Sequence, residues 1–392
     1  MQQKIIKNFD IPNKKIETWK FTDLKKYFEK NDFKPKTNSF KKSNVINSNI
    51  PKNIFFNPNK NFIIIENGIL KKINIKSENL EIKSSKNIFK NKNIKNFLRK
   101  DSLLDINETF LNENIIITIK KNTKLNKTIT IFYYNSENEK NIINNKINIF
   151  LEENAEAEIS EIFFSKEKSF YWNNVHKYID LKKNSKLNHY NIQLESKNAL
   201  HSSINNVNCN SASTYDSFIF STGANLSRIE AISSINAEDI NFNIKGLYLA
   251  NKNQHHDITT LMQHKKPNSK SNQHIKGILE ENSSGVFQGK VIVSQDAQKT
   301  DAFQFNQNLL LSENADVNSK PELEIYADDV KCSHGSTTGD LDEEMLFYLR
   351  SRGLNKQQAK KILIEGFINE LFDEIKNEEI KENLLKTSTE II

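Results

Sequence analysis

A short unit recurs along the middle of the chain, and it constrains the fold more strongly than any other feature of the sequence. Each copy has an apolar residue, a turn that contains Asn, and the start of a strand. The copies begin at Ile119, Leu151, Leu181 and Leu311, and their turns contain Asn122, Asn154, Asn184 and Asn314. Asn tolerates the left-handed backbone conformation that a sharp corner needs. Recurrence of a strand and a corner is typical of the stacked coils of a β-helix, although the repeat by itself favours an ordinary β-sandwich with Asn-rich turns.

Alternating apolar and polar residues fill the region from about residue 114 to residue 330. Examples are Tyr190, Ile192 and Leu194, and further along Phe242 and Ile244. Alternation with period two predicts strands that are buried on one face, and almost no stretch in this region has a helical period. We therefore expect a mainly β core.

The residues before this core have mixed patterns. Lys15–Lys30 and Asp101–Phe110 predict helices, and Phe62–Ile75 predicts two strands joined by a turn at Asn67-Gly68. Asn31–Pro58 is rich in Asn, Ser, Lys and Pro, which is typical of a loop.

The residues after the core predict helices. Asp340 is the expected cap of a helix over Leu341–Ser351, which Gly353 ends, and Asn355 with Gln358 opens a second helix. The expected apolar stripe of that second helix is Ala359, Ile362, Leu363, Phe367, Leu371, Phe372 and Ile375. A third helix is expected from Asn377 to Leu385. The stripe is wide enough to dock on the β core or on a partner. The predicted domains are thus a mixed region (1–113), a β-helix core (114–335) and a helical region (336–392).

Composition indicates the expected compartment of the protein and the kinds of partner that it is not expected to bind. Only two cysteines are present, Cys209 and Cys332, which favours a reducing compartment. Met1–Asp10 lacks the apolar core of a signal peptide, and the most apolar stretch is far shorter than a membrane span of about 20 residues. The net charge of +7 is spread along the chain without interleaved aromatic residues. We expect a soluble, cytoplasmic protein that binds neither nucleic acid nor membrane.

The densest chemical signal is the segment around Cys332 and His334. The two residues lie two positions apart, so on a strand they share a face. Thiolate and imidazole are good ligands for iron or zinc, but two residues cannot complete a site with four ligands. Any metal must then be shared with another segment or chain. On residue types alone, a buried cysteine and a hydrogen-bonded histidine are the favoured interpretation.

A second group of polar residues is His255, His256, Asp257, His264 and His274. It could form a metal site, but no pair has the short helical spacing of a zincin, and satisfied polar groups in an Asn-rich sheet are favoured. The sequence contains neither a phosphate-binding loop nor a G-x-S-x-G elbow. The chain is thus not expected to hydrolyse ATP in the P-loop manner.

The stretch from His255 to Gly353 resembles the core of the SufB/SufD family of iron–sulfur cluster assembly proteins. The matching residues are His256-Asp257, His264, Pro267-x-Ser269-x-Ser271, Lys276-Gly277, Val286-Phe287-x-Gly289-Lys290, Ala297–Ala302, Leu309–Ser312, Lys320–Gly335, Leu341–Glu344 and Leu346–Gly353. Near the start of the chain, Glu17-x-Trp19-Lys20-Phe21-Thr22-Asp23-Leu24 resembles the opening of the SufD branch. Members of the SufB branch are usually longer and carry additional cysteines, and the context of Cys209 does not resemble their sulfur-entry site.

This resemblance implies a right-handed parallel β-helix with helices at both ends. It also implies a non-catalytic scaffold that pairs with SufB and binds the SufC ATPase through the segment after Gly339, so that ATP is used only by SufC. A transient iron–sulfur cluster would lie at the SufB interface, with His334 as the ligand from this chain and Cys332 as a neighbour with a less settled role. The alternatives are a SufB-like homodimer and, in a different class, a β-helix enzyme that acts on polysaccharide.

Overall fold

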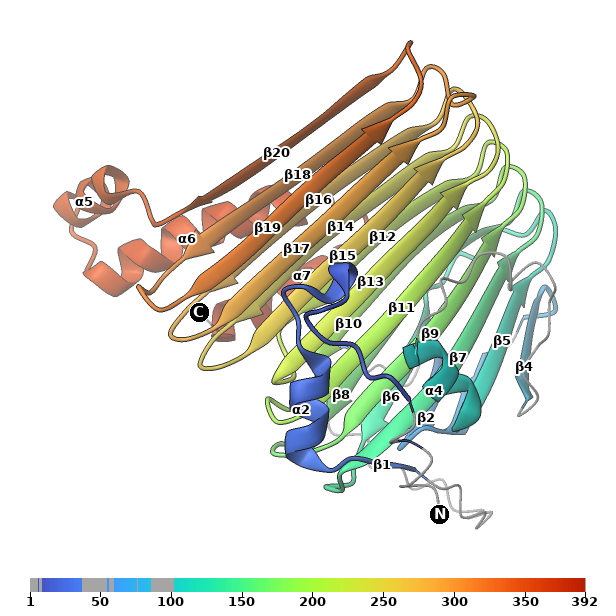
Figure 1. The fold of residues 1–392 in the computed structure, drawn as a ribbon, viewed down its shortest axis with the longest axis horizontal. Coiled ribbons are helices and arrows are strands. Elements are labelled where there is room, and N and C mark those ends of the chain that lie inside the picture. The colour runs from blue at the N-terminus through green and yellow to red at the C-terminus, as the bar shows by residue number, and fades with distance from the viewer. Residues whose placement is uncertain are drawn as a thin grey trace.

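The computed structural model describes residues 6, 9–36, 55, 60–75, 77–85 and 102–391. Their strands form two facing sheets, and the chain passes from one sheet to the other at every corner (Figure 1). All pairings from β5 onward are parallel, so the predicted mainly β fold and the β-helix are confirmed.

Ten described strands belong to each sheet. In order from the C-terminal end, sheet A contains β19 (Asp316–Ile325), β17 (Ser284–Val293), β15 (His255–His264), β13 (Leu226–Ile235), β11 (Leu200–Cys209), β9 (Trp172–Leu181), β7 (Asn141–Leu151), β5 (Glu113–Ile119) and β4 (Leu80–Ser85), with β1 (Lys34–Pro35) beside β7. Sheet B contains β20 (Lys331–Gly339), β18 (Asp301–Leu310), β16 (Lys270–Leu279), β14 (Asn241–Ala250), β12 (Thr214–Ser221), β10 (Lys186–Leu194), β8 (Glu156–Ser165), β6 (Ile129–Asn135), β2 (Asn61–Glu66) and β3 (Ile69–Asn74). The sheets extend beyond the predicted core on both sides, and the division into three domains stays a prediction.

Three copies of the repeated unit form the same corner of the solenoid. Asn122, Asn154 and Asn184 follow the ends of β5, β7 and β9, and each has a φ between 56° and 58°. The side-chain amide of Asn154 donates to Oδ1 of Asn122 over 2.7 Å, and that of Asn184 donates to Oδ1 of Asn154 over 3.0 Å. The repeat therefore predicts the corner and also places neighbouring Asn side chains in a hydrogen-bonded ladder.

The fourth copy of the unit was wrongly grouped with the other three. Leu311 follows β18 of sheet B, so this copy lies at the opposite corner, and Asn314 is not among the residues with positive φ. A hydrogen bond of 3.1 Å from the backbone N–H of Ala315 to the carbonyl of Ser312 closes the turn there.

The interior is built from ladders of equivalent side chains. Leu151, Leu181, Cys209 and Ile235 occupy the same position on successive strands of sheet A. Cys209 is fully buried in this ladder, and burial raises the pKa of its thiol to about 12. It therefore serves as a small apolar residue and not as a nucleophile.

Polar groups also lie inside the solenoid, where the period-two pattern predicts apolar ones. The Glu161 carboxylate is fully buried and contacts Nζ of Lys177 at 2.9 Å, Nε2 of His189 at 2.7 Å and the hydroxyl of Tyr133 at 2.6 Å. Burial by itself raises the pKa of Glu161, but the charge of Lys177 and the hydrogen bonds lower it to about 2.

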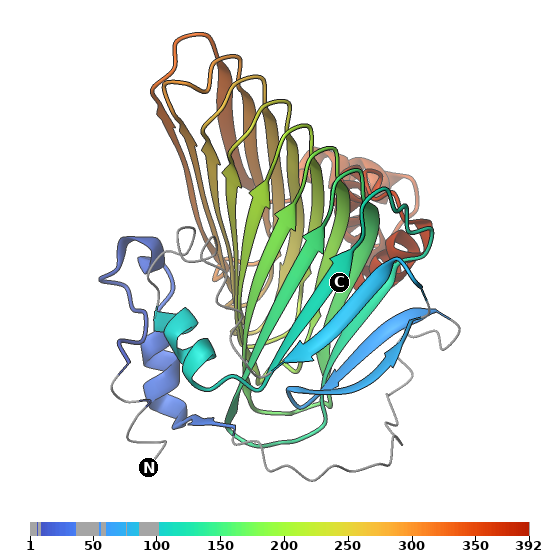
Figure 2. The same ribbon diagram turned by 90° about the vertical axis from the view of Figure 1, so that its right-hand side faces the viewer.

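The helices cover the outer faces of both sheets (Figure 2). α6 (Lys356–Phe372) and α7 (Glu378–Ile391) pack on sheet B, whereas α5 (Glu343–Ser351) projects beyond the end of the solenoid (Figure 1). Within the described ranges, none of the helices has both the length and the apolar character needed to cross a bilayer. α4 (Ser102–Thr109) lies against sheet A and confirms the helix predicted there, although Asp101 lies outside the described residues.

Several details of the helix predictions were wrong. Asp342, and not Asp340, caps α5 by accepting a hydrogen bond from the N–H of Met345. The stripe of α6 that faces sheet B contains Ile364 and Ile368, while Ile362 is exposed. Four of the seven predicted positions, Ala359, Leu371, Phe372 and Ile375, are buried, so the predicted stripe was right in part. The capping box of Asn355 and Gln358 and the end at Gly353 are confirmed.

The N-terminal prediction was right in part. Lys15–Lys30 forms a short 3-10 turn, η1 (Glu17–Trp19), followed by α2 (Leu24–Asn31), instead of one helix, because Asp23 caps α2 and starts a new element. The hairpin is confirmed, with Asn67 and Gly68 both at positive φ. Most of the predicted loop over Asn31–Pro58 lies outside the described residues.

Replacing Phe372 in α6 by Ala tests the packing on sheet B. Phe372 is fully buried, and its ring centroid lies 5.6 Å from that of Phe218 and 6.3 Å from that of Phe220. We expect Phe372→Ala to lower the free energy of unfolding in urea by about 3–5 kcal/mol. Ile362→Ala on the exposed side of α6 is the control, with an expected change within about 0.5 kcal/mol. Equal losses in the two variants would contradict this packing.

Acid should destabilise the fold through its buried histidines. Burial lowers the pKa of His256 to about 3 and that of His264 to about 4, both below the ordinary value of 6.5. Below pH 6.5 the unfolded chain takes up protons that the folded chain excludes, so stability falls as the pH drops from 6.5 toward 4. Each such histidine contributes about 1.4 kcal/mol per pH unit in this window.

Urea unfolding at a series of pH values measures this slope. His264→Gln should make the slope shallower, because it removes one titrating group while an amide can still bond to the neighbouring Ser271 hydroxyl. Ile362→Ala removes no titrating group from an exposed position and is the control, which should leave the slope unchanged. A slope that His264→Gln does not alter would refute the assignment of acid sensitivity to the buried histidines.

Candidate functional site

The C-terminal coil of the solenoid is open at its edge. Within the described chain, β19 pairs only with β17, and β20 pairs only with β18. Every residue of β20 is at least partly exposed. An uncovered strand of this kind presents a row of backbone N–H and C=O groups to which another chain can pair.

Cys332 and His334 lie on the inner face of β20, as their spacing predicts. The Cα partner of Cys332 is Ala302 on β18, and the Cα partner of His334 is Gln304. The hydroxyl of Ser336, on the same face of β20, lies 2.8 Å from the hydroxyl of Ser319 on β19. This contact across the solenoid identifies the face of β20 that points toward the opposite sheet.

The surroundings of the two candidate ligands differ. Cys332 is half-buried and packs against the interior apolar cluster, and burial raises the pKa of its thiol. His334 is exposed at the open end. A metal at Cys332 would therefore have to displace the thiol proton, whereas the His334 imidazole is directly accessible.

The donor set fits a shared metal site better than a complete one. In the part of the chain that the structure describes, no three His, Cys, Asp or Glu residues gather into a group that could hold a metal ion. Cys332 and His334 can thus supply only part of a coordination sphere, and the remaining ligands would have to come from outside this chain.

The second group of polar residues does not converge on one site. Each side chain has at least one hydrogen-bond partner, as expected, although Nδ1 of His264 has none among the described residues. His255 and Asp257 lie on the outer face of sheet A, where Nε2 of His255 contacts the Thr22 hydroxyl at 2.8 Å. His256 and His264 point inward and contact serine hydroxyls at 2.9 and 2.8 Å. Nε2 of His274 lies 2.9 Å from the Gln307 side chain, outside sheet B.

One conspicuous cluster was missed in the sequence. The guanidinium of Arg228 lies 3.9 Å from the Trp19 ring centroid, bonds to the Asp257 carboxylate, and donates to the carbonyl of Thr18 over 2.7 Å. The Thr22 hydroxyl also donates to Asp257. We call Glu17–Thr22 the N-terminal clasp. Its residues and Asp257 both belong to motifs that carry the family resemblance, but no periodicity links positions more than 200 residues apart.

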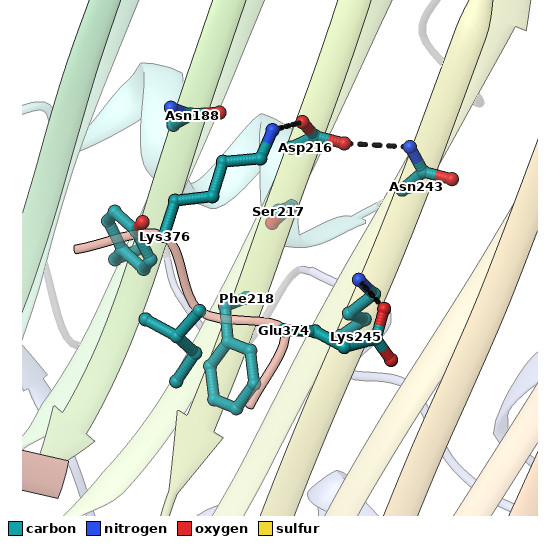
Figure 3. A pocket seen from close by; sticks show the side chains of 10 residues that line it. Asn188, Asp216, Ser217, Phe218, Asn243, Lys245, Glu374 and Lys376 are labelled. Atoms are coloured by element: carbon teal, nitrogen blue, oxygen red, sulfur yellow. Dashed lines mark hydrogen bonds and ion pairs between the residues drawn. The ribbon is translucent and has the colours of Figure 1, made fainter. Parts of the chain in front are cut away.

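A small cavity of about 50 Å³ lies between sheet B and the turn that joins α6 to α7 (Figure 3). Lys376 pairs with Asp216 at 2.5 Å, Asn243 donates to Asp216 over 2.7 Å, and Lys245 pairs with Glu374. Two ion pairs, Lys376 with Asp216 and Lys245 with Glu374, thus fasten the C-terminal helices to sheet B, and neither Cys332 nor His334 lines the cavity.

Comparison with known proteins agrees with the architecture. The family model described as "SUF system FeS cluster assembly, SufBD core domain" matches residues 132–367. The iron–sulfur cluster assembly protein SufD of Escherichia coli (strain K12) is 32% identical over 291 residues, which are 74% of this chain and 69% of that protein. An iron–sulfur cluster assembly SufBD family protein of Synechocystis sp. is 32% identical over 280 residues, covering 69% of this chain and 62% of that protein.

A plant protein is similar to the same extent. Protein ABCI7, chloroplastic, of Arabidopsis thaliana is 32% identical over 297 residues, which cover 74% of this chain and 62% of that protein. The chain thus spans just over two thirds of the bacterial SufD and somewhat less than two thirds of the other two relatives. The matched residues include β20 and its Cys332-x-His334 pair. The chain belongs to the SufBD family of iron–sulfur cluster assembly proteins and is of the SufD type.

Proposed function

We propose that this chain is a non-catalytic, cytoplasmic scaffold subunit that pairs with a SufB subunit and holds a nascent iron–sulfur cluster at their interface. The observation that carries the proposal is a pair of metal-binding side chains, Cys332 and His334, on an open terminal coil. The cluster is cargo that is assembled and passed on. Two donors from this chain suit such a role, because they hold a cluster only while a partner supplies the other ligands.

The open coil favours a protein partner. Near β20, Phe303 and Tyr326 expose large aromatic surfaces of 44% and 64%. β20 itself has a single lysine and no acidic residue, so few charged side chains discourage the pairing of another strand with its edge. A partner that adds strands to the solenoid would satisfy the edge and cover these aromatic residues.

The proposed SufC contact lies on α5. Met345, Phe347 and Tyr348 are 45%, 73% and 50% exposed on this helix. The apolar stripe of α6 could dock on the β core or on a partner, and sheet B covers it, so it is not free to bind the ATPase. An exposed apolar helix face is a suitable surface for a partner, and the sequence has no phosphate loop of its own, so ATP hydrolysis is assigned to the partner.

His334→Ala tests the ligand assignment. The exposed imidazole can be removed without opening a cavity, so the complex should assemble with normal stoichiometry and keep its ATPase activity. Iron and sulfide per assembled complex, measured after anaerobic purification of the co-expressed subunits, should fall because a ligand is lost. Cys332→Ala is the comparison and should have a smaller effect.

Two outcomes would contradict this assignment. An assembled His334→Ala complex with unchanged iron and sulfide would exclude His334 as a ligand and move the proposal to Cys332 or to SufB alone. A scaffold that assembles its cluster without any SufB subunit would favour the alternative of a SufB-like homodimer. A polysaccharide-acting enzyme has no support from the family match.

Phe347→Asp tests the docking surface on α5. It places a charge on an exposed apolar residue, so the fold should be unaffected while copurification of the ATPase falls at least about tenfold, a loss of about 1.4 kcal/mol. Ile73→Asp on β3 is the control, since Ile73 is 42% exposed and lies at the opposite end of the solenoid. Truncation after Leu354 is less informative, because it would uncover the apolar face of sheet B. Full copurification with Phe347→Asp would place the ATPase elsewhere.

A further inference from the structure

Three buried amide side chains lie on the inner face of β18, directly beside the terminal strand. Gln304 and Asn306 are completely buried, and Asn308 is 4% exposed. They adjoin His334, Ser336 and Thr338 on β20. Burial of an amide costs free energy unless each of its polar atoms finds a partner, so the partners of these three groups are informative.

Asn306 and Asn308 are bonded within the solenoid. Asn306 donates to the carbonyl of Ile275 over 3.0 Å, and Asn308 donates to Oδ1 of Asn306 over 2.7 Å. The Tyr248 hydroxyl donates to Oδ1 of Asn308 over 2.6 Å. These two side chains therefore have a structural explanation.

Gln304 differs from its two neighbours. Its Nε2 donates to Oε1 of Gln273 over 3.4 Å, and that oxygen also accepts a hydrogen bond from the Thr260 hydroxyl. Its Oε1 is buried and has no hydrogen-bond partner among the described residues. The side-chain nitrogen of Gln304 thus has a hydrogen-bond partner, whereas its carbonyl oxygen has none in the described part of the chain. The Cα of Gln304 pairs with the Cα of His334 on β20.

The opposite sheet is shaped around this side chain. Gly289 lies inside β17, where a glycine weakens a strand. A Cβ at this position would lie 1.7 Å from Nε2 of Gln304. Gly289 therefore makes room for Gln304 to extend across the interior, which is a second observation that this amide occupies a built position.

We propose that Gln304 is a positioning residue for His334. The two side chains are not bonded in the structure. When the exposed imidazole turns toward the interior, Oε1 of Gln304 accepts a hydrogen bond from its Nδ1–H. Adjacent strands lie about 4.8 Å apart, and Nδ1 is the ring nitrogen nearer the main chain. The hydrogen bond fixes the tautomer and leaves the lone pair of Nε2 directed toward the open edge. Histidines that ligate metals nearly always donate their other N–H to an acceptor in this way. The metal role of His334 rests on the proposed function, whereas its tautomer is a property of this chain alone.

The ring ¹⁵N chemical shifts of His334 test this directly in the full-length chain without iron. His334→Ala identifies its signals among those of the other histidines. We expect the neutral ring to carry its proton mainly on Nδ1, although the Nε2–H tautomer predominates for histidine in water. Gln304→Met keeps the side-chain shape without the carbonyl, and should return the ring to the Nε2–H tautomer. Gly289→Ala should act in the same direction by displacing Gln304.

Asn191→Leu is the matched control. Asn191 is a buried amide on β10 whose two polar atoms have no partner among the described residues, and it lies far from β20 in the solenoid. Its replacement should leave the His334 shifts unchanged. An Nε2–H tautomer in the unmodified chain overturns the proposal even if Gln304→Met fails to fold, and so does a tautomer that Gln304→Met does not alter. Since this readout contains no iron, it can fail while His334 still holds the cluster, and the iron measurement can fail while the tautomer is as proposed.

Discussion

Hydrogen bonding between parallel strands is the interaction on which the rest of the structure depends. From β5 onward, each inner strand takes its backbone partners from the coil before it and the coil after it. Along the two described ladders, an unpaired edge is therefore left at the terminal strands. At the N-terminal end, the edge strands β3 and β4 are antiparallel and carry exposed charged residues, among them Lys72 and Lys83. Such charges discourage pairing with another chain, whereas β20 has few of them. The two ends of the same ladder are therefore unequal, and the candidate site lies at the less protected one.

The stacking of coils also determines which charged side chains can be buried in the interior. Equivalent positions on successive strands touch one another, so a charged side chain needs its partner on a neighbouring coil or on the opposite sheet. Glu161 on β8 meets this requirement, because Lys177 comes from β9 and His189 from β10. Removing one member would leave an unpaired buried charge, and a shift of strand register would separate all three. The network therefore raises the free energy of any fold with misaligned coils, although an apolar interior would cost less free energy to bury.

Local patterns in the sequence predicted the local features of the fold. Asn122, Asn154 and Asn184 could be recognised as corner residues, because left-handed backbone conformation selects Asn within a few residues of a strand end. The spacing of Cys332 and His334 likewise predicted a shared face, because side chains alternate along a strand. Asn314 was misassigned because its motif has the same letters at the other corner, where the turn differs.

Contacts between distant segments could not be predicted in this way. Trp19 and Arg228 stack although 209 positions separate them in the sequence, and only the winding of the solenoid brings β13 under the N-terminal clasp. The same limit applies to Gln304, whose significance depends on Gly289 across the interior and on His334 on the next strand. The motifs of the family resemblance include neither Arg228 nor Gln304, so only the contacts reveal the importance of these two residues.

The N-terminal clasp has a consequence for the open coil. Glu17 pairs with Lys320 on β19 at 2.5 Å, and the carbonyl of Thr18 accepts a hydrogen bond of 3.2 Å from Gln288 on β17. An exposed ion pair contributes little to stability by itself, because solvent screens its charges. The clasp that carries Glu17 is nevertheless fixed in place, because Trp19 is buried against Arg228 and Thr22 is hydrogen-bonded to Asp257.

The terminal coil has a neighbouring coil on one side only, so it forms fewer ladder hydrogen bonds than any inner coil. Contacts from the clasp replace some of the missing hydrogen bonds and restrict the conformations of β19 in the chain alone. A strand that is already ordered loses less conformational entropy on association, so the clasp would lower the cost of the proposed pairing with a partner. The N-terminal clasp thus helps to order the end of the solenoid at which Cys332 and His334 lie.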